Sequence, residues 1–290
     1  MEPKPNPPTE AHLKFILAQA KDNPYMEVIA QQKIDNHFLP YRIEKLTDGS
    51  FDLKNIFSPG EEYLNRFITT NPAMKVMKER AKKMALTDYP VLITGETGTG
   101  KEIIAKSMQG ARTGLTQCIN CAGLPDDLIE SEMFGHVKGS FTGAYGDKVG
   151  LMESARDGVC FLDEVGDMPM KAQAALLRAI QEMKVRPVGS NKSISINCKF
   201  VFATNKDVKA MIKEGTFRLD LYARISTLEL HLTPLYERMD DCVEIIKSMQ
   251  GGEKFLLKYE NRLKTGGFDL GLNVRSLEQY VTRNNVLGEV

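Results

Sequence analysis

The chain has 290 residues, 42% hydrophobic and 26% charged, a globular composition long enough for one large domain and one or two small ones. Lysine and arginine together number 38, as do aspartate and glutamate, so the net charge is zero and no long basic run favours direct DNA binding. There is no apolar run of membrane-spanning length and no signal-peptide core at the start, so we expect a cytoplasmic protein.

Residues 1–60 predict a small N-terminal region to which the sequence assigns no role. The first 10 residues are rich in proline, and we expect them to be disordered. Residues 11–32 have the pattern of a helix broken near Pro24. Residues 41–55 alternate apolar and polar side chains around Asp48-Gly49, which predicts a β-hairpin.

Residues 61–233 alternate helix-like stretches with short apolar runs. The runs are YPVLIT, TQCINC, GVCFLDE, CKFVFAT and STLELHL. Strands without polar alternation are typical of a parallel sheet covered on both faces, so the predicted fold class is α/β, a parallel β-sheet between helices. Only helical patterns remain in residues 234–290, which predicts a smaller helical subdomain.

The cysteines do not indicate a metal site or a disulfide. The chain has five, an odd number, and Cys118 and Cys121 form a C-x-x-C without a second pair. Structural zinc normally takes four nitrogen or sulfur ligands, so we expect these thiols to be small buried apolar groups.

A glycine-rich loop follows the first apolar run. PVLITGETGTGKE reads as strand, turn and helix, in which the glycines let backbone N–H groups face a β-phosphate and Lys101 reaches the β- and γ-oxygens of ATP. Glu102 stands where such loops usually have serine or threonine for Mg²⁺, so the metal is expected to bind a carboxylate elsewhere. The predicted ATP-binding residues of the loop are Gly95, Glu96, Thr97, Gly98, Thr99, Gly100, Lys101 and Glu102.

Polar side chains follow the later apolar runs. Asp163 is a candidate ligand for Mg²⁺ and Glu164 a candidate to polarise the attacking water, as in a Walker B element; a solvated acidic pair is the alternative. Asn205 would position the water or sense the γ-phosphate at the same sheet edge, unless it only caps its strand. Arg218 and Arg224 are candidate arginine fingers acting across a subunit interface, although either alone would be an ordinary surface arginine.

From about residue 70 to 285, the order of these motifs resembles the AAA+ ATPase domain of bacterial enhancer-binding proteins, the activators of sigma-54 RNA polymerase. The matching segments are GETGTGKE, INCAGL, ESEMFGHVKGSFTGA, FLDEVGDMP, AALLRAIQE, FATNKDV, FRLDLYARI, PLYERMDD and NVRSLEQ. The resemblance implies a P-loop NTPase fold with a helical lid, ATP and Mg²⁺ as cofactors, and a homo-oligomeric ring, expected to be a hexamer. Glutamate usually follows the Walker lysine in this family, as Glu102 does here.

The resemblance also assigns the segment GSFTGA to a partner rather than to phosphate. It is similar to the family's GAFTGA loop, which protrudes from the ring and grips sigma-54 in a nucleotide-dependent way. Small residues make such a loop bendable, Phe141 offers an apolar tip and Thr142 a hydrogen bond; a plain glycine-rich connector is the alternative. The predicted partner-binding residues are Gly139, Ser140, Phe141, Thr142, Gly143 and Ala144, with Ser140 in place of the commoner alanine.

Other roles follow from the resemblance alone. Asn120 matches a residue that hydrogen-bonds Glu164 and releases it during the cycle, with a strand-end asparagine as the alternative. Arg275 matches the sensor II arginine of the lid, and residues 185–193 take the place of a second, pore-side loop. The lid lacks the family's usual Pro-Gly, and Tyr236 stands where arginine is usual.

We therefore predict a ring ATPase that hydrolyses ATP to remodel sigma-54 RNA polymerase. No helix-turn-helix DNA-binding domain is expected before the chain ends at Val290: either it was removed or is absent, or the protein activates from solution. One alternative is an AAA+ ATPase of the same architecture with another protein client, against which the intact Phe141-Thr142-Gly143 argues. The other is a non-hydrolysing adaptor or anti-activator, against which Glu164 and both candidate fingers argue.

Overall fold

The computed structural model describes residues 59–110 and 112–288, the strands at 41–45 and 51–55, and residues 14, 16–18 and 30. The chain divides into two units, residues 1–59 and 60–290. In the first unit, β1 (Tyr41–Lys45) pairs antiparallel with β2 (Phe51–Asn55), so the predicted hairpin is present. Its turn and most of the predicted helix at 11–32 lie outside the described residues. None of the helices in the described ranges is long and apolar enough to cross a membrane.

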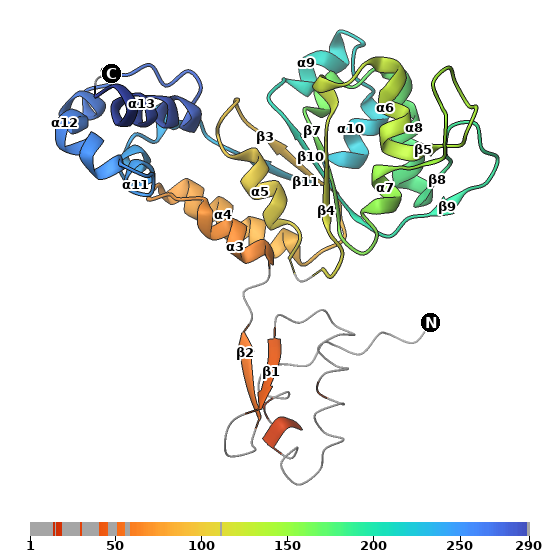
Figure 1. Cartoon of the computed structure of the whole chain (residues 1–290), viewed down its shortest axis with the longest axis horizontal. Helices are drawn as coiled ribbons and strands as arrows, with labels where there is room; N and C mark the ends of the chain where they lie inside the picture. The colour runs from red at the N-terminus through yellow and green to blue at the C-terminus, as the bar shows by residue number, and fades with distance from the viewer. Residues whose placement is uncertain are drawn as a thin grey trace. The chain divides into compact units, whose positions relative to one another are not determined.

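The second unit is built on a parallel sheet of five strands in the order β11-β3-β10-β7-β4 (Figure 1). Each strand falls in one of the five predicted runs; the three central strands are almost wholly buried between the helices, whereas the two edge strands are only partly buried. The strands are β3 (Val91–Thr94), β4 (Thr116–Asn120), β7 (Val159–Asp163), β10 (Lys199–Thr204) and β11 (Leu228–His231). The α/β prediction is confirmed.

Helices cover both faces of this sheet. Alternate residues of one strand enter different apolar cores: Cys160 and Leu162 of β7 join one, and Val159 and Phe161 join the other. The first core is closed by α6 (Asp126–Phe134), α7 (Leu151–Ser154), α8 (Met170–Glu182), α9 (Val208–Lys213) and α10 (Leu219–Ile225). The second is closed by α3 (Pro59–Arg66), α4 (Pro72–Ala85) and α5 (Lys101–Ser107).

Residues 61–85, whose sequence EEYLNRFITTNPAMKVMKERAKKMA reads as one helix-like stretch, form parts of two helices in the structure. Asn71 caps α4 by accepting hydrogen bonds from the backbone N–H groups of Ala73 and Met74, and Pro72 occupies the first helical position. An asparagine cap followed by proline is a strong start signal, so a second helix begins here rather than a continuation of α3.

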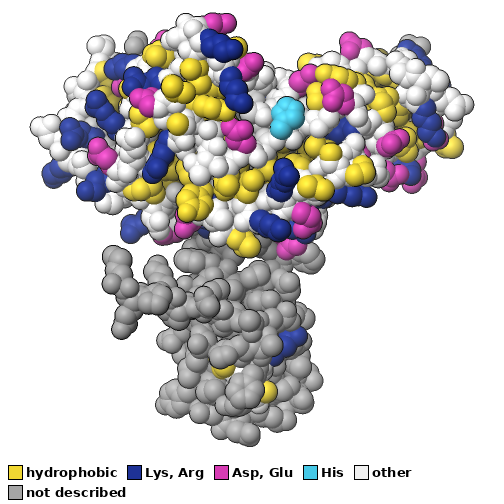
Figure 2. Space-filling model, turned by 180° about the vertical axis from the view of Figure 1, so that it is seen from behind, with side chains coloured by type: hydrophobic (Ala, Val, Ile, Leu, Met, Phe, Trp, Pro, Cys, Tyr) yellow, Lys and Arg dark blue, Asp and Glu magenta, His cyan; other side chains and the backbone are white. Residues whose placement is uncertain are grey.

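The helical lid has an apolar core of its own. Helices α11 (Asp240–Lys247), α12 (Gly252–Lys264) and α13 (Val274–Leu287) pack around buried side chains such as Phe255 and Leu277. Short 3₁₀ turns elsewhere are η1 (Cys121–Gly123), η2 (Val165–Asp167) and, leading into the lid, η3 (Leu235–Glu237). On the face seen in Figure 2, acidic and basic side chains are interspersed over the described surface rather than gathered in one basic patch.

Two small hairpins lie beside the first core. One pairs β5 (Gly135–His136) with β6 (Lys148–Val149), and the other pairs β8 (Lys184–Val185) with β9 (Ile194–Ser195). A parallel bridge between His136 and Val188 joins them. The GSFTGA segment therefore lies at the tip of the first hairpin, next to the second predicted loop.

Candidate functional site

The phosphate loop connects β3 to α5 at the carboxyl edge of the sheet, where parallel α/β folds bind ligands. Gly98 and Gly100 have φ angles of 80° and 104°, in the left-handed region that glycine adopts without strain. This backbone curl is what allows successive N–H groups to face a phosphate. The loop also needs glycine for space, since a side chain on Gly98 would overlap the carbonyl oxygen of Leu272 in the lid.

Lys101 begins α5 and is buried under the loop. Its Nζ donates hydrogen bonds to the carbonyl oxygens of Gly95 at 2.8 Å and Glu96 at 3.2 Å. Glu164 Oε1 lies 3.7 Å from the same nitrogen. The ammonium is thus positioned by backbone carbonyls and one carboxylate, at the place where phosphate oxygens would compete for it.

Asp163 and Glu164 lie at the end of β7. Asp163 Oδ1 accepts a hydrogen bond from the Glu164 N–H at 3.0 Å, and Glu164 has the left-handed angles φ 49° and ψ 49°. Burial, followed by the neighbouring Glu164 carboxylate, raises the pKa of Asp163 above its usual 3.8. In a regular strand, Asp163 and Glu164 would point to opposite faces; the left-handed backbone of Glu164 departs from that geometry, and such strain is common at functional sites.

Asn205 connects this acidic pair to the phosphate loop. Its backbone N–H donates to Glu164 Oε2 at 3.1 Å, and its side-chain Nδ2 donates to Thr97 Oγ1 at 3.1 Å. The structure therefore brings Lys101, Glu164, Asn205 and the loop together.

Asn120 lies at the same edge but makes a different contact. It is the register partner of Asp163 on the adjacent strand, yet its Oδ1 accepts from the N–H of Ala122 at 2.9 Å. This local bond caps η1. The contact between Asn120 and Glu164 thus remains a prediction for another state of the site.

The other polar residues of the loop bond locally. Thr99 is buried and its Oγ1 donates to the carbonyl oxygen of Glu96 at 2.8 Å. Glu102 is exposed and pairs with Lys106 one turn along α5, at 2.7 Å. Its carboxylate is therefore turned along the helix surface.

The lid contacts the phosphate loop directly. Asn273 Nδ2 donates to Glu96 Oε2 at 3.1 Å and to the Thr97 carbonyl at 3.0 Å, and Tyr236 donates its hydroxyl to Glu96 Oε1 at 2.9 Å. The bond to Glu96 raises the pKa of the tyrosine. Arg275 lies in the first turn of α13, with its Cγ 3.5 Å from the position of a Cβ on Gly98.

A buried ion pair lies behind the loop. Arg238 Nη1 and Asp241 Oδ2 are 3.0 Å apart, with 3% and 0% of each residue exposed. Arg238 Nη2 also reaches the Thr99 carbonyl at 3.3 Å, while Asp241 accepts hydrogen bonds from Thr69, Thr70 and the Asn71 N–H. The pair thus joins the lid, the phosphate loop and the segment before α4.

A cleft of about 340 Å³ opens beside the loop, over the ends of β3, β10 and β11. Gly95, Glu96 and Asn205 form one wall, and Tyr222 and His231 form part of the other. The cleft thus gives access to the first residues of the loop, Gly95 and Glu96.

The two candidate fingers are on α10. Arg218 directly precedes the helix, and its guanidinium makes a bidentate contact with the carboxylate of Asp220, at 3.0 and 2.7 Å. This bidentate contact raises the pKa of Arg218 and lowers that of Asp220. Arg224 is exposed in the last turn. Neither guanidinium is bonded to the phosphate loop in the described chain.

The GSFTGA loop is closed by a few backbone hydrogen bonds. The N–H of Gly139 donates to the Ala144 carbonyl at 2.8 Å, and the Ala144 N–H donates to Phe141 at 3.0 Å. Thr142 and Gly143 are exposed between them, whereas the Ala144 side chain is buried. The loop is therefore a tight turn with an open tip.

Phe141 does not form that tip. Its ring meets the His136 ring edge-on at 5.0 Å, and Ser131 Oγ lies 2.7 Å from His136 Nδ1. The aromatic side chain that projects is Tyr145, which is 90% exposed. Sequence reasoning missed Tyr145 because it directly follows the six-residue motif; an unpartnered aromatic in a glycine-rich loop is the signal that could have identified it.

Ser140 faces the second hairpin. A Cβ on Gly189 would collide with the Ser140 side chain, so the two loops are in close contact. The Ser140 Oγ is buried there, and the described residues offer it no hydrogen-bond partner.

The sequence from residue 67 to residue 231 matches the family described as the Sigma-54 interaction domain. The chain belongs to this family. Its relatives include the response regulator protein PilR of Pseudomonas aeruginosa, 38% identical over 86% of this chain and 58% of PilR. Another is the transcriptional regulatory protein GlrR of Escherichia coli, 44% identical over 62% of this chain and 41% of GlrR. This sigma-54 interaction domain protein thus spans about half the length of such relatives.

A solved structure shares the fold. NtrX from Brucella abortus in complex with ATP matches with a TM-score of 0.65 and 27% identity, over 77% of this chain and 53% of NtrX. The α/β sheet with a helical lid is therefore the P-loop NTPase fold of the AAA+ class, as the resemblance implied.

Sequence reasoning found the residues of the family motifs but missed the lid contacts. Tyr236 stood out only as a departure from arginine, and nothing in the sequence marked Asn273, Arg238 or Asp241 as neighbours of the phosphate loop. These contacts join residues more than 100 positions apart, such as Glu96 and Tyr236, so no local pattern encodes them.

Proposed function

We propose that this sigma-54 interaction domain protein is a ring-forming ATPase that hydrolyses ATP to remodel sigma-54 RNA polymerase. The observation that supports this best is the convergence of Lys101, Glu164 and Asn205 on the phosphate loop, in the same unit as the GSFTGA hairpin. Membership of the family and the ATP complex of NtrX point in the same direction.

Each polar residue has a defined task in this mechanism. Lys101 exchanges its carbonyl partners for oxygens of the β- and γ-phosphates. Glu164 orients the attacking water and takes its proton, with one oxygen fixed by the Asn205 N–H. The Asn205 side chain, bonded to Thr97, is placed to respond to the γ-phosphate at the end of the loop.

Asp163 fits Mg²⁺ bound together with the nucleotide. Magnesium at such sites takes one or two carboxylates, phosphate oxygens and water rather than a cage of protein ligands. The described residues accordingly hold no cluster of three or more His, Cys, Asp and Glu side chains that could bind a metal alone. The ion would neutralise charge on the phosphates. Burial and the Glu164 carboxylate raise the pKa of Asp163, which is half-buried at the sheet edge, so a cation beside it would stabilise its charged form.

Arg218 and Arg224 act on the neighbouring subunit's nucleotide in this proposal. The support is that neither contacts the phosphate loop of its own described chain and that Arg224 is exposed. Mixing two inactive variants tests this: Arg224→Ala keeps a complete loop, and Lys101→Ala keeps the finger. Mixed rings should regain ATPase activity, because an Arg224→Ala site can receive Arg224 from a Lys101→Ala neighbour. Mixtures as inactive as the separate variants would contradict a finger acting across the interface.

The GSFTGA loop is the proposed contact with sigma-54, through Thr142 at its exposed tip. Hydrolysis at the subunit interface would shift the loop between two positions set by the γ-phosphate. The four backbone hydrogen bonds within residues 137–145 are all local to the loop, and a Cβ on Gly139 or Gly143 would meet no described atom within 4 Å, so such a movement breaks few contacts.

Binding to isolated sigma-54 tests this function. The chain should bind sigma-54 in the presence of ADP with aluminium fluoride, a mimic of the hydrolysis transition state, and not with ADP alone. Thr142→Ala should abolish that binding and leave ATP hydrolysis intact. A chain that hydrolyses ATP as a ring but never binds sigma-54 would indicate a different protein client, and one that binds ATP without hydrolysing it would indicate an adaptor.

A further inference from the structure

The lid binds both oxygens of one phosphate-loop carboxylate. Tyr236 donates its hydroxyl to Glu96 Oε1 at 2.9 Å, and Asn273 donates Nδ2 to Glu96 Oε2 at 3.1 Å. The same amide reaches the Thr97 carbonyl at 3.0 Å, and the N–H of Val274 reaches the Gly98 carbonyl at 3.1 Å. Three consecutive residues of the loop are therefore held from the lid side.

Asn273 is the centre of these contacts. It is fully buried, and its Oδ1 accepts a hydrogen bond from the Leu235 N–H at 2.6 Å, so one side chain joins η3, α13 and the phosphate loop. Its backbone angles, φ 54° and ψ −125°, are unfavourable for any residue with a side chain. Such strain persists only where the surroundings impose it, which here are the contacts on both sides of the amide.

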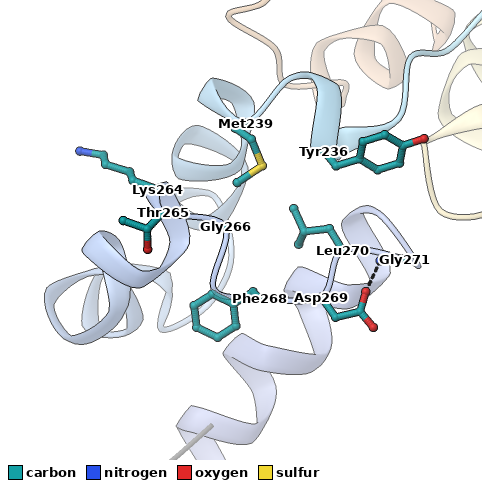
Figure 3. A pocket seen from close by; sticks show the side chains of 9 residues that line it. All are labelled: Tyr236, Met239, Lys264, Thr265, Gly266, Phe268, Asp269, Leu270 and Gly271. Carbon is teal, nitrogen blue, oxygen red and sulfur yellow. Dashed lines mark hydrogen bonds between the residues drawn. The ribbon is translucent and has the colours of Figure 1, made fainter.

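Tyr236 is the exposed member of the set. About half of the residue, 51%, is accessible to solvent. Its ring lines a pocket of about 560 Å³ in the lid together with Met239 and Leu270, and Figure 3 shows the hydroxyl pointing away from that pocket. The ring has room to turn, so the bond to Glu96 can break without disturbing the lid core, whereas Asn273 cannot move alone.

The opposite side of the loop is bonded to the catalytic edge. Thr97 Oγ1 accepts from Asn205, whose N–H binds Glu164. Glu96 and Thr97 thus lie between the lid on one side and the residues proposed for hydrolysis on the other. A shift of the lid would pull on Thr97, the loop residue that Asn205 holds, and on its neighbour Glu96.

We propose that Tyr236 and Asn273 are positioning residues that, through Glu96 and Thr97, fit the phosphate loop to the nucleotide according to the position of the lid. This inference rests on the proposed ATPase function. The two residues touch no phosphate themselves; they fix the loop that does. Loss of either contact should therefore weaken nucleotide binding and leave the hydrolysis step nearly unchanged.

The first test compares two tyrosines. We call the contacts of Tyr236 and Asn273 with Glu96 and Thr97 the lid latch. Tyr236→Phe removes one hydroxyl from the lid latch, and Tyr280→Phe removes one that donates to the Asp269 carbonyl within the lid. Tyr236→Phe should raise both the KM for ATP and the Kd of a fluorescent ATP analogue by about threefold to tenfold, with kcat within about twofold. Tyr280→Phe should change neither. Equal KM values for the two variants would overturn the role of Tyr236.

The second test exchanges the two functional groups. Asn273→Asp keeps an acceptor for the Leu235 N–H but places a carboxylate against Glu96, so KM should rise by more than about tenfold. Adding Glu96→Gln restores one amide and one carboxylate at opposite positions and should recover the part of that loss that comes from Glu96, while the bond to the Thr97 carbonyl stays lost. A double variant no better than Asn273→Asp, with an unfolding midpoint like that of the wild type, would overturn the inference.

The same experiments separate this inference from the function on which it rests. A wild-type chain that neither binds the analogue nor hydrolyses ATP would contradict the proposed function. A wild-type chain that does both, with Tyr236→Phe and Asn273→Asp unaffected, would contradict only the lid latch.

Discussion

The phosphate loop and the GSFTGA loop are both rich in glycine, yet they have opposite surroundings. A Cβ on Gly95 or Gly100 would lie within 3.0 Å of another residue, and one on Gly98 would overlap the lid. A Cβ on Gly139, Gly143 or Gly146 would meet nothing within 4 Å. In the phosphate loop, glycine therefore allows other residues to approach the backbone closely. In the GSFTGA loop, the same residue type allows the backbone to bend.

Polar contacts divide in the same way. The phosphate loop is bonded to the lid through Asn273, to β10 through Asn205 and to the buried Arg238. The GSFTGA loop is bonded mainly to itself, and the buried Ser140 hydroxyl finds no hydrogen-bond partner in the part of the chain that the structure describes. We infer that the first loop is held in one shape and the second is free to change shape, which the following variants test.

The largest effect is expected at the buried Arg238–Asp241 ion pair, which supports the phosphate loop. Arg238→Met leaves the Asp241 carboxylate buried without its cation and should lower the free energy of unfolding by about 3–5 kcal/mol. The control is Arg156→Met, because the Arg156 side chain is 80% exposed and 3.8 Å from Asp157, and its loss should cost less than about 1 kcal/mol. Urea denaturation measures both. Similar losses for the two arginines would contradict the comparison.

Paired glycine substitutions test the packing difference directly. Gly98→Ala forces a side chain into the lid at a φ of 80° and should cost about 2 kcal/mol of stability and most of the affinity for ATP. Gly146→Ala adds the same methyl group to open space at an ordinary φ and should stay within about 0.5 kcal/mol of the wild type. Thermal unfolding and binding of a fluorescent ATP analogue provide the readouts. A Gly98→Ala chain that binds ATP normally would show that the lid yields.

Low pH should reduce the stability that the Asp241 carboxylate contributes behind the phosphate loop. Burial alone would raise the pKa of this carboxyl, but hydrogen bonds from Thr69, Thr70 and Arg238 outweigh burial and lower it below the usual 3.8. Because the folded-state pKa is lowered, Asp241 contributes stability above the unfolded-state pKa and loses it as the pH falls through the folded-state value. The difference in unfolding free energy between wild type and Asp241→Asn should thus be constant near neutrality and shrink below about pH 4. A difference that is independent of pH down to 3 would contradict this linkage.

The comparison also shows what the sequence could predict. The five strands were predictable because each contains a short, mainly apolar run, such as VLIT or KFVFAT; Asp163 and Glu164 follow from their position at a strand end, and Lys101 from the glycine loop before it. The split between α3 and α4 had a signal, Asn71-Pro72, which the longer helical pattern outweighed. These are local features, so the sequence encodes them locally.

The lid latch and the orientation of Phe141 had no such signal. The φ of Asn273 and the partners of Glu96 depend on how the lid meets the sheet, and the ring of Phe141 depends on His136, five residues earlier in a hairpin. Long-range packing sets the contacts of Asn273 and Glu96, whereas the ring contact of Phe141 is local to its hairpin; composition and periodicity describe neither.

A smaller effect is expected where the GSFTGA loop contacts the loop of the second hairpin, at Ser140 and Gly189. Ser140→Ala removes a buried hydroxyl that lacks a partner and keeps the Cβ that packs near Gly189. The closed form of the loop should become more stable by about 1 kcal/mol, which corresponds to about fivefold slower amide exchange in residues 137–147. Hydrogen exchange followed by mass spectrometry measures this, with residues 95–101 as the internal control. Faster exchange in the variant would mean that the hydroxyl supports the closed form.

The smallest effect on stability is expected at the residue proposed to matter most for the partner. Thr142 is exposed, and none of its side-chain atoms takes part in a hydrogen bond identified among the described residues, so Thr142→Ala should change the free energy of unfolding by less than about 0.5 kcal/mol. A loss of sigma-54 binding with no loss of stability would separate function from folding at this loop. If Thr142→Ala unfolds the chain as Arg238→Met does, the tip is part of the packed structure, and the contrast between the two loops is wrong.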